Sequence, residues 1–441
     1  SARASYEHCL ADAPNRLDCA TNLASVLLDE GDSARAEELY RAVLLQRPDD
    51  GDAAFNLAML LHDRKTVTAT REAASLYQLA VEHDDARWDA WANLAAALAE
   101  LKDAPLRAIR AYCSAILLIE QQPSEQQDPA ALSRLSYGYG LQLSELSPAA
   151  CRQLARDPGS LLIGDADPAE LCLENAQNAL RTATTLDPTN AQAEHMLATL
   201  VSAGAVAAGS AGVATIDKAS PAFVEALFDD FAATFDERLV GQLHYKVPEL
   251  VGAAASALGA DRGGFRHTLD AGAGTGLAGP HLRGLTRNRL VAVDISSEML
   301  ARAAQLPPTV DGIPIYDGLH ALDLLDTNAQ QLLGEAATDG FDLVTAADVL
   351  VYFGKLDQLL HHFARLSAPG AGLIFSCERV EEHEADAGWR ILPSGRFAHS
   401  KAYVVDTAAA AGYQLRAYEQ IVPRMEGEVP VKGHLFTFEL E

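Results

Sequence analysis

The segment Leu269–Gly276 constrains the fold more than any other, because a short apolar run ends on Asp270 and continues into glycines at 272, 274 and 276. Glycine has no Cβ and adopts positive φ at little cost, so such a loop can lie directly against a bulky ligand. The loop opens a predicted helix, whose first N–H groups point toward the bound group. The pattern predicts a ligand site at the end of a strand.

Strand-like and helix-like segments alternate after this point, which is typical of a parallel sheet with helices on both faces. The predicted strands are 267–270, 289–294, 320–322, 341–345 and 372–377, and the predicted helices are 277–285, 297–305, 327–336, 355–367 and 401–411. Two more helices are expected before the glycine loop, at 220–239 and 246–258. Two strand-like runs, 414–423 and 432–440, predict a closing antiparallel hairpin.

The first half of the chain repeats. Asn-Leu-Ala begins at Asn22, Asn56 and Asn93. Each copy is followed by small and aromatic residues at helical spacing, namely Ala36/Tyr40/Val43, Ala73/Tyr77/Ala80 and Ala108/Tyr112/Ala115, with a further copy at Ala176/Leu180/Ala183. Such spacing lets paired helices pack closely. The pattern resembles the tetratricopeptide repeat, a helix–turn–helix solenoid, and is blurred between 121 and 172, where loops or an insertion are expected.

The repeat asparagines are candidates for partner binding. In the family that this half resembles, the asparagine before Leu-Ala often faces a groove, where its amide bonds an extended peptide backbone. The resemblance implies a ladder of Asn22, Asn56 and Asn93 for a protein partner. The alternative is that asparagine is simply common at this position of the repeat.

Carboxylates follow the predicted strands in series: Asp270, Asp294, Asp323 and Asp348. Ligands of such sheets bind at the carboxyl ends of the strands. Over residues 220–441 the series resembles the class I S-adenosylmethionine-dependent methyltransferases.

The resemblance implies a role for each residue of this series. Asp294 accepts from the ribose hydroxyls, and Asp323 accepts from the adenine amino group. The apolar neighbours of the adenine are Ile295, Met299 and Leu324. The methionine part of the cofactor is held by Asp270, Gly272, Gly274 and Gly276. The cationic end of the cofactor is positioned by Thr275 and Asp348.

Further segments resemble a subgroup of predicted methyltransferases that carry tetratricopeptide repeats at the N-terminus. They are 228–236, 245–248, 348–352 and 392–400. The expected fold class is therefore all-α followed by α/β. It comprises a repeat solenoid over 1–202, a linker of small residues over 203–217, and a Rossmann-like doubly wound methyltransferase domain over 218–441 that ends in the hairpin.

Two other functions remain open. Gly274, Gly276 and Gly279 also fit GxGxxG, and Asp294 follows at the distance that a dinucleotide fold requires, which would indicate an NAD(P)-dependent oxidoreductase. A protein-interaction scaffold with a cofactor-binding but inactive domain is the second alternative.

The polar segment 378–400 is expected at the ligand end of the sheet. His399 is the candidate general base and Arg396 the candidate clamp for an acidic group of the acceptor, while Tyr245 and Tyr352 are expected to line the pocket. The alternatives are a surface or capping histidine and core tyrosines. The acidic run 378–384 favours a solvated face over a metal site, and no metal is expected.

The sequence does not identify the individual methyl acceptor. Neither DPPY nor NPPY, the amide-nitrogen signatures, follows the fourth predicted strand. A small, carboxylate-bearing molecule and a peptide side chain both remain open. A net charge of −27 disfavours a nucleic-acid backbone as partner.

The compartment is inferred from two absences. No apolar run is long enough to span a membrane, and no signal peptide opens the sequence. The six cysteines form no CxxC or zinc spacing, so we expect buried thiols in a reducing compartment and a cytoplasmic protein.

Overall fold

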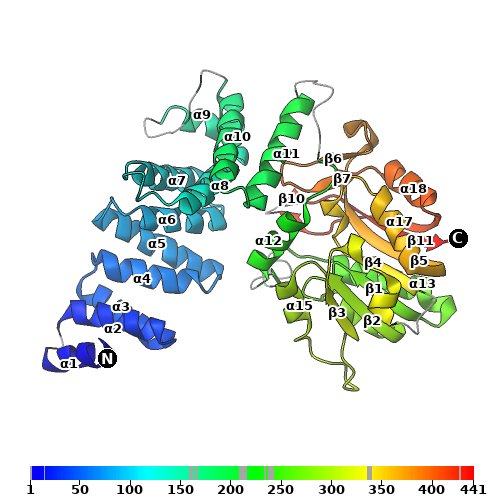
Figure 1. Ribbon diagram of the computed structural model, residues 1–441, viewed down its shortest axis with the longest axis horizontal. Helices are drawn as coiled ribbons and strands as arrows, with labels where there is room; N and C mark the ends of the chain where they lie inside the picture. The colour runs from blue at the N-terminus through cyan, green and yellow to red at the C-terminus, as the bar shows by residue number, and fades with distance from the viewer. Residues whose placement is uncertain are drawn as a thin grey trace. The chain divides into compact units, whose positions relative to one another are not determined.

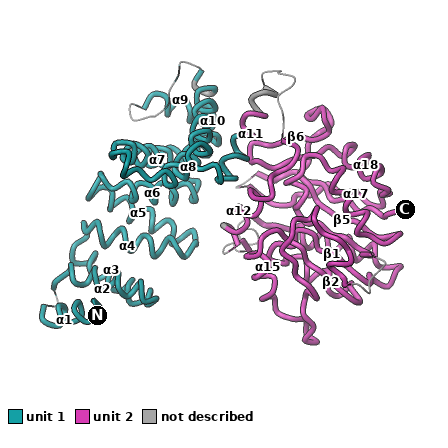
Figure 2. The backbone as a smooth tube through the Cα atoms, in the orientation of Figure 1, with its two compact units in different colours: residues 1–197 teal, residues 198–441 magenta. Residues whose placement is uncertain are grey.

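The chain forms two compact units, Ser1–Leu197 and Ala198–Glu441 (Figure 2). The computed structural model describes residues 2–13, 15–157, 162, 164, 167–207, 216–232, 235–236, 243–334, 340–426 and 429–441. The division falls inside helix α11, Ala191–Ala207. The predicted linker began at residue 203, yet the helix continues through 207. Residues 208–215 of that linker lie outside the described part.

The first unit is built from helices (Figure 1). They are α1 (Ala2–Asp12), α2 (Leu17–Asp29), α3 (Ser33–Gln46), α4 (Gly51–His62), α5 (Val67–His83), α6 (Trp88–Leu101), α7 (Pro105–Glu120), α8 (Pro129–Ser144), α9 (Pro148–Leu154) and α10 (Pro168–Leu186), followed by α11. Side chains define several of the starts. Asp32, Asp50 and Thr66 each accept the N–H of the residue three positions later, which satisfies a donor that the helix itself leaves open.

The repeated positions form the contacts between helices. Ala36, Tyr40 and Val43 are completely buried, as are the equivalent small residues of α5, α7 and α10. Each of the pairs α2/α3, α4/α5 and α6/α7 packs together, and α8 packs against α10. Close packing of paired helices agrees with a solenoid, while the assignment to the tetratricopeptide family stays a prediction.

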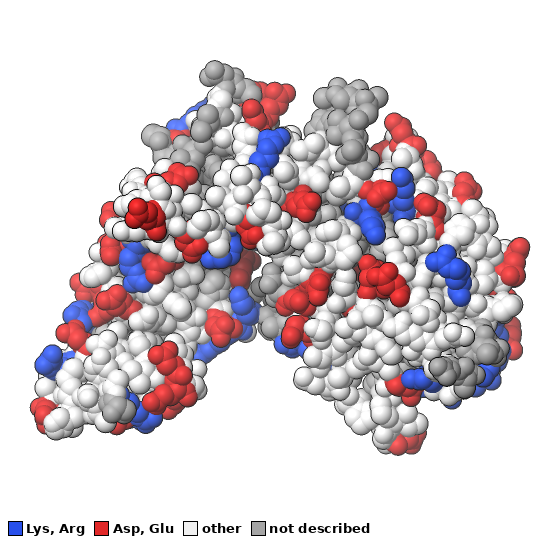
Figure 3. Space-filling view, in the orientation of Figure 1, with Lys and Arg blue, Asp and Glu red and all other residues white. Residues whose placement is uncertain are grey.

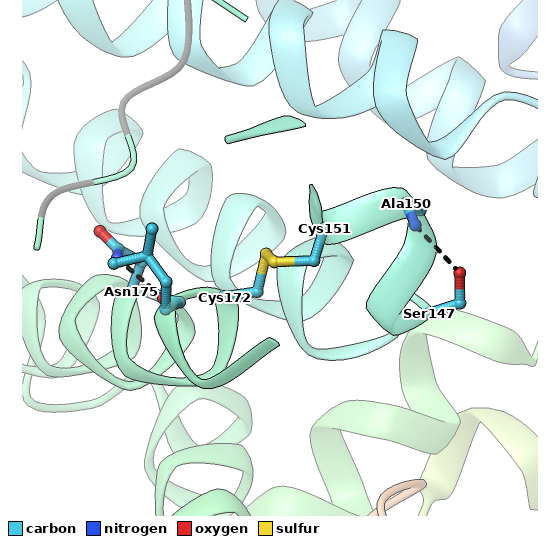
Figure 4. The surroundings of a disulfide bond; sticks show 6 residues. Ser147, Ala150, Cys151, Cys172 and Asn175 are labelled. Carbon is cyan, nitrogen blue, oxygen red and sulfur yellow. Dashed lines mark hydrogen bonds between the residues drawn. A yellow bond between two sulfur atoms is a disulfide. The ribbon is translucent and has the colours of Figure 1, made fainter. Parts of the chain in front are cut away.

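Disulfide bonds join helices at two places in this unit. Cys9 is bonded to Cys19, and Cys151 of α9 is bonded to Cys172 of α10 (Figure 4). The stretch 121–172, where the repeat pattern is weakest, contains α8 and the short helix α9, and Ser147 caps the N-terminus of α9.

The expectation of six buried thiols was wrong for these four cysteines. Partners separated by 10 and 21 residues are brought together by helix–helix packing, which no local spacing reveals. Cys113 and Cys377 are buried and belong to neither disulfide. Because disulfides are typical of oxidising compartments, they do not favour the predicted cytoplasmic location.

The second unit is organised around a mixed sheet (Figure 1). Its strands are β1 (Phe265–Ala271), β2 (Thr286–Asp294), β3 (Gly318–Ala321), β4 (Phe341–Ala346), β5 (Ser367–Arg379), β6 (Trp389–Ile391), β7 (Phe397–His399), β8 (Tyr413–Ile421) and β11 (Gly433–Leu440). The order is β3-β2-β1-β4-β5-β11-β8, with β7 beside the end of β5 and β6 beside β7. The first five strands are parallel, and β11 runs antiparallel to β5 and β8.

Helices cover both faces of this sheet. They are α12 (Pro221–Phe231), α13 (Val247–Gly259), α14 (Gly279–Arg283), α15 (Ser297–Ala303), α16 (Ala329–Leu333), α17 (Asp357–Leu366) and α18 (Lys401–Ala410). One buried cluster joins the sheet to α13, α14 and α15, and a second joins it to α16, α17 and α18. This two-sided packing agrees with the predicted doubly wound fold, and the closing hairpin is present.

Two features of this unit were missed by the sequence analysis. The predicted polar segment 378–400 contains β6 and β7, and β7 pairs in parallel with the end of β5. The hairpin connection contains a small ladder of β9 (Met425–Glu426) and β10 (Val429–Pro430).

The surface visible in Figure 3 carries acidic side chains with basic ones scattered between them, in keeping with the net charge of −27. Among the helices that the structure describes, none is long and apolar enough to cross a membrane.

Candidate functional site

A cavity lies in the second unit where the parallel strands end. Most of the residues predicted for the site line it: Tyr245, Asp270, Gly272, Gly274, Thr275, Asp294, Ile295, Asp323, Leu324, Asp348, Tyr352 and Arg396. Three predicted residues do not line it: Gly276, Met299 and His399. The fold therefore gathers side chains from the ends of β1, β2, β3 and β4 around one space, as expected for a parallel sheet.

The three loop glycines have positive φ but serve different purposes. A Cβ at Gly272 would lie 2.4 Å from Val349, and one at Gly276 would lie 2.8 Å from Leu306, so both positions are needed for packing. Among the described residues, a Cβ at Gly274 would meet only Phe235, at 4.0 Å. The protein thus leaves space beside Gly274, on the wall of the cavity, that a bound molecule can use.

Asp294 holds the glycine loop in place. Its Oδ2 accepts the N–H of Gly274 at 2.8 Å, and its Oδ1 accepts the N–H of Ser296 at 2.9 Å. The residue is 8% exposed, and burial raises its pKa. Since each carboxylate oxygen accepts more than one hydrogen bond, both oxygens retain capacity for ligand hydroxyls.

Asp270 is fully buried at the end of β1 and is already bonded to protein groups. Its Oδ2 accepts the hydroxyl of Tyr316 at 2.6 Å, and its Oδ1 accepts the hydroxyl of Thr345 at 3.2 Å. Burial raises the pKa of Asp270 to about 6. These contacts fix the end of the strand on which the loop is built.

The predicted adenine neighbours divide into two groups. Ile295 and Leu324 line the cavity, and Asp323 lies beside them with its Oδ1 accepting the N–H of Leu325 at 2.9 Å. Met299 is completely buried and does not line the cavity, because its position on α15 directs it into the packing under the helix. Its predicted contact with the cofactor is not supported by this placement.

Two carboxylates of the segment around α12 bond to the loop region, which the sequence analysis did not foresee. Asp229 accepts the hydroxyl of Ser296 at 2.6 Å, and Asp236 accepts the hydroxyl of Thr275 at 2.5 Å. Phe228 and Phe235 from the same segment line the cavity. The only signal in the sequence for this arrangement was the resemblance of 228–236 to the methyltransferase subgroup.

The lining of the cavity includes part of an ion-pair cluster. Arg424 donates to Asp348 Oδ2 at 2.8 Å and also contacts Glu378 and, at 3.4 Å, Glu426. Arg396 donates to Glu426 at 2.9 Å. The predicted clamp is thus already paired with protein carboxylates. Arg424 was missed, because a lone arginine in a predicted turn carries no local signal.

Tyr245 and Tyr352 line the cavity next to this cluster. Burial, and next to it the carboxylate of Asp348, raises the pKa of Tyr245 well above its usual value, so this phenol stays protonated at neutral pH. The ring of Tyr352 packs edge-on against Phe228, with centroids 5.6 Å apart. An aromatic wall therefore adjoins the charged residues.

His399 is placed differently from its predicted role. It is completely buried on β7, and its Nε2 lies 2.8 Å from the carbonyl oxygen of Phe353 and 3.1 Å from that of Gly354. Because a carbonyl only accepts, Nε2 carries the proton. Burial lowers the pKa of His399 to about 4. This geometry fits a structural hydrogen bond between β7 and the loop after β4, and not a general base in the cavity.

The chemistry offered by the cavity is that of binding and alignment. Its lining combines strand-end carboxylates, the glycine loop, aromatic rings and the arginines of the ion-pair cluster. In the described part of the chain, no group of three or more His, Cys, Asp or Glu side chains is arranged to hold a metal ion.

Comparison with known proteins agrees with this geometry. Residues 269–373 match a family described as a methyltransferase domain. No curated protein matches the chain.

Solved structures resemble part of the chain in fold. They include a magnesium protoporphyrin IX methyltransferase from Synechocystis (17% identity, 44% of this chain and 79% of that one, TM-score 0.33) and an N-methyltransferase from Bradyrhizobium japonicum (17%, 44% and 95%, TM-score 0.32). A third is an S-adenosylmethionine-dependent methyltransferase from Clostridium acetobutylicum (15%, 48% and 99%, TM-score 0.35).

The matched family segment begins in β1 and ends in β5, so it contains the glycine loop and the strand-end carboxylates of the cavity. Residues 269–373 of the chain are therefore similar to a methyltransferase domain.

Proposed function

We propose that the cavity of the second unit binds S-adenosylmethionine on the glycine loop and an acceptor, a small molecule or a peptide, beside Tyr245 and Tyr352. The observation that carries the proposal is the shared cavity, which Asp294, Asp323 and Gly274 line together with the two tyrosines. A methyl donor and its acceptor must occupy one space from which water is excluded.

The residues present fit the nucleoside of the cofactor. Asp294 is held by two N–H groups and keeps lone pairs for the ribose hydroxyls. Asp323 is positioned for an amino group, with Ile295 and Leu324 as apolar neighbours. A Cβ at position 274 would enter the space beside Gly274. This space admits the part of the cofactor that joins the ribose to the sulfonium. When bound, the cofactor supplies the methyl group.

The protein's own part in the reaction is to align the methyl donor with the acceptor and to enclose both. Transfer from a sulfonium is an in-line displacement, so a base is needed only for an acceptor that still carries a proton. Phe228, Phe235 and Tyr352 provide apolar walls that exclude water. His399 has no part in this proposal, since its Nε2 proton is directed to backbone carbonyls.

Calorimetry on the full chain tests the cofactor assignment. S-adenosylhomocysteine is expected to bind with a dissociation constant near the micromolar range, about −8 kcal/mol. NAD is expected to give no binding heat. Binding of NAD in place of S-adenosylhomocysteine would replace the methyl donor by a dinucleotide and overturn the proposal.

For the helical unit we propose a role in recruiting a protein partner. Asn56 and Asn93 are half-buried, and Asn22 is exposed. Asn22 lines a small cavity together with Asp18, Thr21, Arg47, Asp49, Asp50, Asp52 and His83. Side-chain amides with this partial exposure are available to a peptide backbone.

The triple variant Asn22→Ala, Asn56→Ala, Asn93→Ala tests this role. It is expected to keep S-adenosylhomocysteine binding and turnover of small acceptors while losing modification of a protein partner. Unchanged modification of the protein partner would argue against a peptide-binding groove.

A further inference from the structure

An ion pair in the cavity leaves two polar atoms without a partner. Arg424 is 2% exposed, and both it and Asp348 line the cavity. Arg424 Nε, a donor, and Asp348 Oδ1, an acceptor, are buried and have no hydrogen-bond partner among the described residues. Buried polar groups are nearly always satisfied, by protein, water or a ligand. Because both side chains line the cavity, a molecule bound there can complete both atoms.

The surroundings hold this pair in place. Asp348 has a φ of +61°, a conformation that residues other than glycine rarely adopt, and its N–H donates to Ser376 Oγ at 2.8 Å. The other nitrogens of the guanidinium are engaged by Asp348, Glu378 and Glu426. The unpartnered atoms therefore belong to rigid groups, and unfavourable backbone geometry of this kind gathers at binding sites.

The charges around the pair favour one kind of ligand. The carboxylates of Asp348, Glu378 and Glu426 meet the guanidinium groups of Arg424 and Arg396, which leaves one excess negative charge in the cluster. A further carboxylate would add to this excess near buried groups, whereas an ammonium would compensate it. The carboxylate-bearing acceptor expected from the sequence is thus disfavoured at this position.

We propose that Asp348 and Arg424 bind the acceptor through a protonated amine that stands next to a carbonyl group. The ammonium donates to Asp348 Oδ1, and the carbonyl oxygen accepts from Arg424 Nε. The inference rests on the proposed function, because it assigns this part of the cavity to the acceptor. It also reassigns Asp348, predicted from the family resemblance to contact the cofactor. The amino terminus of a peptide and a small α-amino amide share this chemistry.

The aromatic wall indicates what adjoins the amine. Phe228 and Tyr352 pack edge-to-face at 5.6 Å, and both line the cavity near the cluster. Ring faces attract cations and apolar groups alike. An acceptor with an aromatic or apolar side group on the carbon beside its amine fits both features.

Three probes that share a phenyl ring test the inference: phenylalaninamide, phenethylamine and 3-phenylpropionate. Each is titrated by calorimetry into the full chain saturated with S-adenosylhomocysteine. Phenylalaninamide is expected to bind at least about tenfold more tightly than phenethylamine, because it alone completes both orphaned atoms. The phenylpropionate is expected to bind most weakly. Equal binding of all three, or a preference for the carboxylate, would overturn the inference.

The variant Asp348→Asn is expected to remove the preference for phenylalaninamide and to leave S-adenosylhomocysteine affinity within about threefold. Glu419→Gln is the control, since this exposed carboxylate of β8 lies outside the cluster and does not line the cavity. It is expected to keep the preference. If Asp348→Asn weakens S-adenosylhomocysteine binding as much as it weakens phenylalaninamide binding, Asp348 contacts the cofactor and the inference is contradicted.

The experiments distinguish failure of the proposed function from failure of the inference about the acceptor. Absence of S-adenosylhomocysteine binding to the unmodified chain refutes the proposed function, while its binding without discrimination among the probes refutes only the inference. A tetrapeptide beginning with phenylalanine separates the two sources. Tighter binding than that of phenylalaninamide identifies a peptide amino terminus, and weaker binding identifies a small amino amide.

Discussion

Asp294 accepts the N–H of Gly274 at 2.8 Å, so the carboxylate that ends β2 shapes the loop that follows β1. The two residues are 20 positions apart in sequence. One side chain therefore both holds the glycine loop and presents lone pairs to the cavity. Changes at Asp294 are expected to act on ligand binding through both effects.

The variant Asp294→Ala is expected to weaken S-adenosylhomocysteine binding by roughly 2 kcal/mol, about 30-fold, since it removes a charged acceptor. Calorimetry measures the change. The control is Asp342→Asn, because Asp342 accepts the N–H groups of Arg266 and His267 at the opposite end of the strands. Equal affinity of Asp294→Ala and the unmodified chain would show that the ribose lies elsewhere.

Gly272→Ala and Gly274→Ala are expected to separate folding from binding. A Cβ at 272 collides with Val349, so this variant should lower the melting temperature clearly. Among the described residues, a Cβ at 274 meets only Phe235, at 4.0 Å, so that variant should lose about 1 kcal/mol of stability, from its positive φ. It should nevertheless lose most of its S-adenosylhomocysteine affinity. Differential scanning fluorimetry with and without the ligand compares them. The reverse order of effects would contradict the assignment of open space to position 274.

Acid is expected to destabilise the second unit through two buried histidines. Burial lowers the pKa of His399 and of His434 to about 4, from a usual value of 6.5. Between pH 6.5 and pH 4 the unfolded chain takes up protons that the folded chain does not, so stability is complete above this range and falls as the pH is lowered through it. A shift of this size corresponds to roughly 3 kcal/mol for each histidine.

The variant His399→Gln tests this origin, because the amide keeps a donor for the carbonyls of Phe353 and Gly354 but does not titrate. Its melting temperature should fall less between pH 7 and pH 4 than that of the unmodified chain. The exposed His383→Gln serves as control. A pH–rate profile that loses its acid limb in His399→Gln would instead restore His399 as a base.

Reduction is expected to destabilise the helical unit. In the chain-entropy description, opening a loop of about 20 residues such as that closed by Cys151 and Cys172 costs roughly 3 kcal/mol. A phosphine reductant should lower the melting temperature of the unmodified chain and have no effect once Cys9, Cys19, Cys151 and Cys172 are all serine. Thiol titration of the unfolded, unreduced chain should detect only Cys113 and Cys377. Six reactive thiols in that titration would show that neither bond forms.

The sequence by itself determined the local features of this protein. Glycines at 272, 274 and 276 after an apolar run indicate a strand and a ligand loop, because glycine adopts at little cost the positive φ that all three have. Helical periodicity marked Ala36, Tyr40 and Val43 as buried. These predictions depend on residues that are neighbours along the chain.

Only the tertiary structure decided which distant residues meet. Arg424 reaches Asp348 across 76 residues of sequence, because β11 runs antiparallel beside β5 and brings the closing hairpin back to the strand ends. The same packing places His399 in the interior and directs Met299 away from the cavity. Burial and long-range pairing depend on how helices and strands pack, and a local pattern of residue types contains no record of that packing.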